Sequence, residues 1–422
     1  MRTMKESGIE WVKDIPSTWD VAYLSAVLSE RKHKNLGMKE NNLLSLSYGN
    51  VIRKDISTND GLLPESFEGY NVIEKDDIVL RLTDLQNDHR SLRTGLCKER
   101  GIITSAYCTL KKNSTKCDSR FLQYYLHSFD ICKGFYGMGA GVRQGLNYDG
   151  IRKIEIVLPP FAEQATIADC IVEKTEKVDA LIANQEAQIV KLKAYKQSLI
   201  TEVVTKGLDP NVPMKDSGVE WIGEIPKHWR LNRLKYIASY NDESLSEKEP
   251  DDLVIRYVEI GSVTLENGIT NIEEMQFVNA PSRARRITKV GDVIVSTVRT
   301  YLKAIAPITE DGLIVSTGFC VIRPNKSISS KYLEYFTKSD IFSDCVSSNS
   351  VGISYPAINA SRLMNFYIIE PPEDEQKRIA EYLDQKCSKV DELISIKQQK
   401  IEKLNQYKKS LIYEYVTGKK EV

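Results

Sequence analysis

The stretch SGIEWVKDIPSTW at residues 7–19 is repeated almost unchanged as SGVEWIGEIPKHW at residues 217–229. Self-similarity at a long, fixed spacing indicates a duplicated structural unit. Within the first copy, Trp11, Pro16 and Trp19 combine large apolar side chains with a turn former. We therefore interpret the motif as core and turn at the start of a fold that the chain builds twice.

The repeat extends along the whole chain. GIITSAYCTLK from Gly101 returns as GLIVSTGFCVIR from Gly312, and PPFAEQATIA from Pro159 returns as PPEDEQKRIA from Pro371. The segments KVDALI and KVDELI follow in step, and so do Y-K-x-SLI and VT further on. The sequence therefore consists of two copies of one unit of about 210 residues.

The composition describes a globular chain with room for two domains. Its 422 residues are 41% apolar, which suits two cores of ordinary size. No apolar run approaches the roughly 20 residues that span a bilayer, and the N-terminal residues do not resemble a signal peptide, so we expect a cytoplasmic protein without a membrane partner. The eight cysteines form no C-x-x-C pair, so we expect reduced thiols, no zinc site and no disulfide framework.

Each unit divides into a mixed segment and a helix. DDIVL at Asp76 and IEIVLPP at Ile154 are rich in β-branched residues, which is typical of strands, whereas SRFLQYYLHS at Ser119 predicts a short helix. We expect an α+β domain with a curved sheet; a closed barrel fits the same pattern. Because proline suits a helix start, each double proline marks where a long helix begins. The predicted boundaries are 1–158 and 208–370 for the α+β domains, and 159–207 and 371–422 for the helices.

Both helices carry a coiled-coil seam, in which apolar residues alternate at steps of four and three. Polar residues interrupt the two seams at matching places, Gln185 with Lys397 and Lys196 with Lys408, as expected where a register must be fixed. The first helix leads into the second unit, so the second helix must run back to pair with it, which predicts an antiparallel pair with pseudo-twofold symmetry. The apolar seam residues are Val178, Ile182, Ile189, Leu192, Leu199, Val203, Val390, Ile394, Ile401, Leu404, Leu411 and Tyr415.

Two similar domains on stiff helices suit a ligand with two separated, non-identical sites. Duplex nucleic acid is the commonest such ligand, and the helices would then act as a ruler. The alternative is a scaffold without DNA, in which the same helices hold two partner proteins. A dependence of binding on salt concentration distinguishes the two, because only phosphate contacts release counterions.

The repeated motifs resemble those of one known family. E-W-[IV]-x-x-[IV]-P-x-x-W opening a domain, G-[LI]-I-x-[ST]-x-[YF]-C in its middle and PP-x-x-EQ-x-x-IA before a K-V-D-x-L-I helix all occur twice. This pattern is similar to the specificity subunit of type I restriction-modification systems, and it covers nearly the whole chain.

The resemblance implies two target recognition domains that read the two halves of an asymmetric bipartite DNA sequence, with helices that set the spacer. It implies double-stranded DNA, two methyltransferase (modification) subunits and restriction-translocase subunits as partners. No cofactor is expected in this chain: S-adenosylmethionine would belong to the methyltransferase, and ATP and magnesium to the restriction subunit. The expected role is recognition of DNA in phage defence, without catalysis.

The sequence lacks the groups of catalytic or ligand-binding residues that an enzyme needs. The four histidines are scattered, and no phosphate-binding glycine loop or metal-ligand spacing occurs. LPPF at Leu158 resembles the amine-binding motif of amino-methyltransferases, but its first residue is not an amide or acid, and the second copy reads EPPE at Glu370. We assign both stretches to helix entry.

The chain balances 58 basic against 58 acidic residues, so any DNA affinity must come from local clusters and from partner subunits. Two groups of loops diverge between the copies while their surroundings match, as expected of two different base readers. One group follows or flanks the strands at Asp77 and Asp292, and the other comprises GMGAGVRQGLNY from Gly137 and SSNSVGISYP from Ser347. The candidate DNA-binding residues are Arg81, Thr83, Arg90, Arg93, Arg143, Gln144, Asn147, Arg283, Arg285, Arg286, Thr297, Arg299, Tyr301, Lys303, Asn349 and Ser354.

Overall fold

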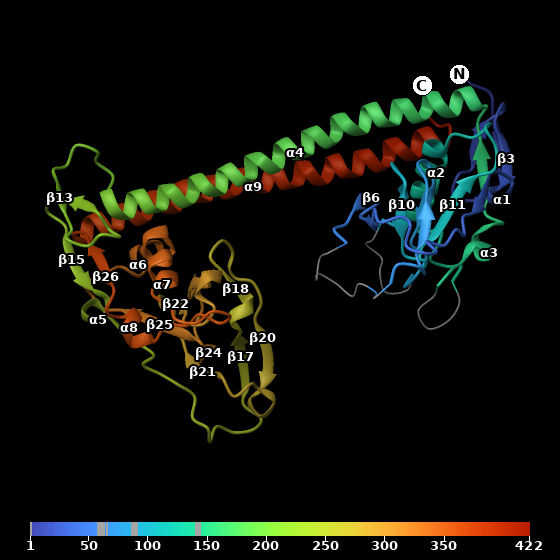
Figure 1. Ribbon diagram of the computed structural model, residues 1–422. Helices are drawn as coiled ribbons and strands as arrows, with labels where there is room; N and C mark the ends of the chain where they lie inside the picture. The colour runs from blue at the N-terminus through green and yellow to red at the C-terminus, as the bar shows by residue number, and fades with distance from the viewer. Residues whose placement is uncertain (1, 57–63, 65, 86–91, 140–144) are drawn as a thin grey trace. The chain divides into compact units, whose positions relative to one another are not determined.

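The computed structural model describes residues 2–56, 64, 66–85, 92–139 and 145–422 (Figure 1). The chain folds into two compact units. Unit 1 comprises residues 1–185 and 399–422, and unit 2 comprises residues 186–398. Each long helix therefore contributes residues to both units.

Unit 1 begins with a hairpin, β1 (Met4–Glu6) with β2 (Asp14–Pro16), and contains a four-stranded antiparallel sheet of order β4-β11-β8-β9. Helix α2 (Ser119–Ile131) packs on it, with Asp118 accepting hydrogen bonds from the first turn. The remaining elements are β3 (Asp20–Tyr23), α1 (Leu24–Val27), β4 (Leu28–Glu30), β5 (Leu44–Ser47), β6 (Asn50–Arg53), β7 (Asn71–Ile73), β8 (Ile78–Leu80), β9 (Thr94–Leu96), β10 (Gly101–Ile103), β11 (Cys108–Lys112), α3 (Tyr148–Ile151) and β12 (Glu155–Leu158).

Unit 2 repeats the order of elements found in unit 1. It also contains a second four-stranded sheet, β20-β17-β24-β21. Its other sheet, β16-β25-β22-β23, corresponds to the sheet of unit 1. The elements are β13 (Met214–Asp216), β14 (Glu224–Pro226), β15 (Arg230–Arg233), α5 (Leu234–Ile237), β16 (Ala238–Tyr240), β17 (Val254–Val258), β18 (Val263–Thr264), β19 (Gly268–Ile269), β20 (Glu273–Gln276), β21 (Ala284–Ile287), β22 (Val293–Ser296), β23 (Ile305–Pro307), β24 (Leu313–Ser316), β25 (Phe319–Pro324), α6 (Ser330–Lys338), α7 (Asp340–Ser348), α8 (Ala360–Leu363) and β26 (Tyr367–Glu370), with short 3-10 helices at Ile260–Ser262, Phe277–Asn279 and Thr300–Leu302.

The duplication holds at the level of strand pairing. β7 pairs antiparallel with β10 as β21 does with β24, and an isolated parallel bridge between Leu43 and Ile102 stands where β17 pairs parallel with β24. Among the described residues the strands form open sheets, so the closed-barrel alternative does not describe this fold. The fold is α+β with an internal repeat.

The two long helices begin directly after the double prolines. α4 (Phe161–Lys206) runs from unit 1 into unit 2, and α9 (Glu373–Val416) runs from unit 2 into unit 1 (Figure 1). Within unit 2, Lys196 on α4 bonds Asp391 on α9 while Gln188 accepts from Lys397, so the helices pair antiparallel. Every apolar seam residue named from the sequence is buried or half-buried, whereas flanking residues such as Leu181 and Val190 are exposed.

In each unit, the duplicated opening motif packs against the C-terminal end of a long helix. Trp19 and Trp229 are fully buried. A Cβ on Gly207, just after α4, would lie 3.1 Å from the Trp229 ring, and one on Gly418, just after α9, would lie 3.1 Å from the Trp19 ring. Both glycines have positive φ, so only glycine suits both the turn and the close approach. The motif therefore occurs twice because each unit must dock one helix end.

Candidate nucleic-acid interface

In unit 2, two loops that are far apart in the sequence meet at the end of strand β22. We call residues 297–303 and 347–359 the paired loops of unit 2. Backbone bonds join them: Arg299 N–H donates to the Pro356 carbonyl (2.8 Å), and Ile358 N–H donates to the Thr297 carbonyl (2.9 Å). The sequence singled out both loops separately, and the fold places them against each other.

The side chains of these paired loops form a polar and aromatic surface. The Arg299 guanidinium lies 4.7 Å from the centre of the Tyr355 ring, and the Thr300 hydroxyl lies 2.7 Å from that of Ser350. Asn349 accepts a hydrogen bond from Arg362 (3.2 Å). Tyr301 is exposed nearby. Guanidinium, hydroxyl, amide and aromatic groups are those that contact phosphates and base edges.

Backbone strain marks this surface. Arg299 and Lys303 adopt φ values of +51° and +48°, a left-handed conformation that side-chain-bearing residues adopt at a cost. In unit 1, Asp84 occupies the place of Arg299 and has φ +57°. The same strained turn thus follows the matched strand in both units, while the side chain it carries differs in charge.

Unit 1 builds the same frame with different side chains. Its paired loops are residues 81–85 and 134–147, the second described as far as residue 139 and again from residue 145. Leu146 N–H donates to the Leu82 carbonyl (2.8 Å), as Ile358 does to Thr297. Asn147 caps α3 through Gly150 N–H, and Asn359 caps α8 through Ser361 N–H. Equivalent backbone bonds therefore hold two divergent sets of loops.

Arg93, one of the candidate DNA-binding residues, lies in the interior of unit 1. Its side chain is 0% exposed, and its guanidinium donates to the carbonyls of Arg81 (3.1 Å), Thr83 (2.8 Å) and Asp84 (3.2 Å). It also lies 5.2 Å from the Tyr136 ring centre. Arg93 thus shapes the loop from within, and the exposed Thr83 is the side chain presented to solvent.

Two further candidates, Thr297 and Lys303, form contacts within unit 2 that stabilise the paired loops. Thr297 is buried and its hydroxyl donates to the Gly318 carbonyl (2.9 Å), so this threonine anchors the loop. The Lys303 ammonium lies 2.6 Å from Asp344, which neutralises it. Both residues therefore support the surface more than they offer a free group to DNA.

The three arginines of residues 283–286, at the start of β21 and just before it, lie in different surroundings. Arg283 lies at the end nearest the paired loops, because its carbonyl accepts from Thr317 N–H (2.8 Å) beside the glycine that Thr297 binds. Its guanidinium pairs with Glu259. Arg285 and Arg286 lie farther along the strand and are half-buried, Arg285 with its guanidinium 4.8 Å from the Phe277 ring centre.

The remaining candidates fall into two groups. Asn147, Asn349 and Ser354 lie on the paired loops, with Asn147 and Ser354 exposed, and Arg81 is half-exposed at the end of β8. Arg90, Arg143 and Gln144 lie outside the described residues.

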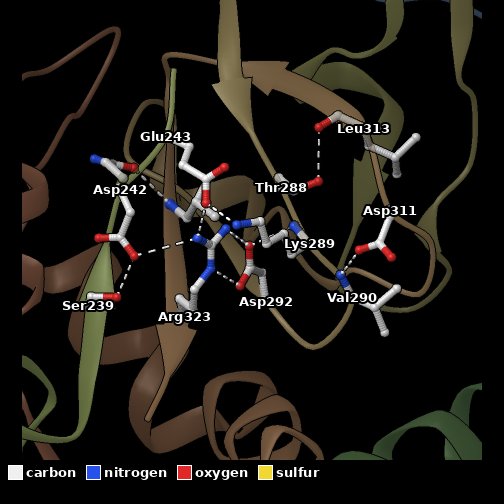
Figure 2. Close-up of polar contacts among 12 residues, drawn as sticks. Ser239, Asp242, Glu243, Thr288, Lys289, Val290, Asp292, Asp311, Leu313 and Arg323 are labelled. Carbon is white, nitrogen blue, oxygen red and sulfur yellow. Dashed lines mark hydrogen bonds and ion pairs between the residues drawn. The ribbon is translucent and has the colours of Figure 1, made fainter. Parts of the chain in front are cut away.

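A buried acid, Asp292, forms a network of polar contacts at the start of the strand that leads into the paired loops (Figure 2). Asp292, directly before β22, accepts two hydrogen bonds from Arg323 (2.9 and 2.8 Å) and one from Lys289 N–H (2.9 Å). Glu243 joins the network by pairing with Arg323 (2.7 Å). The hydrogen bond to Asp292 raises the pKa of Arg323, so this cation stays charged.

The equivalent acid of unit 1, Asp77, pairs with an arginine from a different part of the chain. Asp77 pairs with Arg31 (2.5 Å), which follows β4, while Arg323 of unit 2 belongs to β25. Burial raises the pKa of Asp77, and the Arg31 ion pair opposes that rise. Both units thus keep one charge-compensated carboxylate at the start of the strand, because an unpaired buried carboxylate would be costly.

Sequence reasoning missed three exposed residues of the unit 2 surface: Ile353, Tyr355 and Arg362. The signal for Tyr355 was its place in the divergent SSNSVGISYP stretch, but its stacking under Arg299 depends on tertiary structure. Among the described residues no group of His, Cys, Asp and Glu is placed to hold a metal ion. No described helix is long and apolar enough to cross a membrane.

Comparisons with known proteins show which proteins this duplicated chain resembles. A family model described as the type I restriction modification DNA specificity domain matches residues 226–406. The MjaVIII type I restriction enzyme specificity subunit of Methanocaldococcus jannaschii is 25% identical over 333 residues, which cover 76% of this chain and 75% of that protein. Its MjaX counterpart, named as putative, is 26% identical over 327 residues, which cover 74% and 70%.

Solved structures share the fold. A chain from a study of complex assembly and conformational transition of the type I R-M system is 17% identical, covers 95% of this chain and 98% of its own, and gives a TM-score of 0.69. Its likeness extends through both repeats and both long helices. The duplicated fold with its two long helices is therefore shared with a solved chain of that system. Over about three quarters of its length the chain is similar to specificity subunits of type I restriction-modification systems, and residues 226–406 match their DNA specificity domain.

Proposed function

We propose that each unit reads one half of an asymmetric bipartite DNA sequence through its own paired loops. The observation that carries this proposal is the equivalence of the Leu146–Leu82 and Ile358–Thr297 backbone bonds, which hold different side chains on one frame. A frame that stays constant while its loops diverge suits two readers of different sequences. The strained turns at Asp84 and Arg299 lie within these loops and support the same assignment.

We further propose that α4 and α9 set the spacer between the half-sites. Both helices are continuous, 46 and 44 residues long, so neither offers a hinge in its interior. Helices of this kind also supply a surface for partner subunits. Methylation and cleavage would take place on the methyltransferase and restriction-translocase subunits, which would hold S-adenosylmethionine, ATP and magnesium.

A domain graft tests the two-reader proposal. Residues 18–158 are replaced by those of a relative with a different recognition sequence, and the methylated sequence is mapped in cells that carry the complete system. Because unit 2 keeps its own loops, one half of the site should change while the other half and the spacer stay the same. A change in both halves would contradict the assignment of one half to each unit.

A further inference from the structure

The second loop of unit 2 ends in an apolar tip. Val351 and Ala357 exchange two backbone hydrogen bonds (2.9 and 3.0 Å), which closes a narrow hairpin around residues 352–356. Ile353 at its tip is 102% exposed, so its side chain contacts almost nothing in the protein. Val351 and Tyr355 of the same hairpin are also exposed, at 72% and 62%, so the hairpin carries a group of exposed apolar side chains, the kind of surface that marks interaction sites.

Gly352 fixes the direction of this tip. It has φ +123°, and a Cβ added there would lie 3.0 Å from the Tyr355 carbonyl oxygen. Only glycine suits this close turn. The hairpin is thus a built feature that presents Ile353.

Two arginines contact this hairpin or the residues that lead into it. The Arg299 guanidinium stacks on Tyr355, two residues from Ile353, and Arg362 bonds the amide of Asn349. Across the described residues neither arginine forms an ion pair with a carboxylate, whereas Lys303 nearby is paired with Asp344. A hairpin that combines an apolar tip with nearby guanidinium groups lacking ion pairs is complementary to a polyanion that also offers apolar groups.

We infer that Ile353 contacts a thymine methyl group in the major groove of the half-site that unit 2 reads, while Arg299 and Arg362 lie against the flanking phosphates or bases. This inference rests on the proposed function. The major groove admits a two-stranded ribbon of this width, and the thymine C5-methyl is the apolar group exposed there. Ile353 is therefore a specificity-determining residue for an A·T pair.

Replacement of thymine by uracil tests the contact, because it removes the C5-methyl group and leaves the Watson–Crick pair intact. The full-length chain, co-purified with its modification subunits, is titrated with a duplex carrying the methylation-mapped recognition sequence. Each thymine of the unit 2 half-site is replaced singly by deoxyuridine. One replacement should weaken wild-type binding about fourfold, the effect of one lost methyl contact.

The Ile353→Ser variant should bind the thymine duplex several-fold more weakly and should bind the thymine and uracil duplexes equally. Val290→Ser is the matched control, because Val290 is an exposed β-branched residue that precedes β22, at the end opposite the paired loops. This control should keep the wild-type preference for thymine. Unchanged thermal midpoints verify that both variants are folded.

The outcomes separate the inference from the proposed function. If wild-type protein binds the mapped sequence but Ile353→Ser keeps the full thymine preference, the thymine contact is wrong and the two-reader proposal stands. A wild-type complex insensitive to every uracil, or a unit 2 half-site made only of G·C pairs, overturns the contact in the same way. If the wild-type complex does not prefer the mapped sequence over unrelated DNA, the proposed function itself fails.

Discussion

Lys196 Nζ on α4 lies 2.7 Å from the Asp391 carboxylate on α9, and the repeat places the equivalent pair, Lys408 and Asp179, at the same 2.7 Å in unit 1. Both lysines occupy polar breaks in the apolar seam. An ion pair at such a place favours one helix register over its neighbours, at some cost in stability. Two equivalent pairs therefore lock the antiparallel register from both ends.

Reversing one charge should expose this coupling. Lys196→Asp places a carboxylate opposite Asp391 and should lower the free energy of unfolding by about 1 kcal/mol, a modest loss because both side chains are partly exposed. Adding Asp391→Lys should restore most of it, as measured by urea unfolding of the four proteins of the cycle. Strictly additive losses would show that the pair does not contribute. The control is Lys177→Asp, which makes the same charge reversal at an exposed ion pair with Glu173, within one helix and not between the two helices.

Arg93 should be needed for the shape of the unit 1 loops and not for phosphate binding. Arg93→Met would leave the carbonyls of Arg81, Thr83 and Asp84 without their donor, so we expect a loss of about 3 kcal/mol in unfolding free energy. Hydrogen exchange at Leu146 N–H should accelerate. Arg53→Met, at an exposed arginine of the same unit, is the control. A stable Arg93→Met protein with a reduced salt slope would instead assign Arg93 to DNA.

Salt dependence distinguishes the arginines of unit 2 and also tests the scaffold alternative. Arg299→Ala should weaken DNA binding of the assembled complex and reduce the slope of log K against log salt by about one. Arg285→Ala should change the slope less, since Arg285 lies along β21 against Phe277. A larger effect of Arg285→Ala would move the interface to β21, and binding without any salt slope would favour the scaffold.

His127 should make the stability of unit 1 sensitive to acid. Burial, followed by the nearby Lys408 and Lys409, lowers the pKa of His127 from 6.5 to about 4. The unfolded chain therefore takes up this proton at higher pH than the folded chain, so stability is fully present above pH 6.5 and is lost as the pH falls towards 4. The loss should approach about 3 kcal/mol. His127→Gln should flatten the stability profile between these pH values, and an unchanged profile would exclude His127 as its source.

Much of the architecture follows from local sequence patterns. The double prolines marked the helix starts within two residues, since proline is tolerated there and not inside a helix. The duplication also indicated that Trp19 and Trp229 share one role. Their packing against Gly418 and Gly207 joins residues distant in sequence, which no local pattern reveals.

The recognition surface was predictable as a set of loops, but the orientation of its side chains was not. Arg93 and Arg299 look alike in sequence, as arginines in divergent loops, yet one is buried under the backbone and the other stacks on Tyr355. Ile353 carries no signal of its own in the sequence, because its exposure depends on the hairpin that Val351 and Ala357 close. Whether such a side chain is buried or exposed depends on the tertiary structure.

Lengthening both long helices together tests whether the helix pair sets the spacer between the half-sites. The antiparallel pairing of Gln188 with Lys397 indicates where both helices must be lengthened together, so four residues are inserted after each. Four residues advance a helix by about 6 Å and turn it by about 400°, so the facing direction is nearly kept.

Mapping methylated bases in cells carrying this variant is the most direct test. Since B-DNA rises about 3.4 Å per base pair, the spacer should lengthen by about one or two base pairs while both half-sites stay the same. Four residues inserted instead after the exposed Glu247 should leave the spacer unchanged. If the lengthened helices methylate DNA only at the original spacer, they do not set the distance, and the account is wrong.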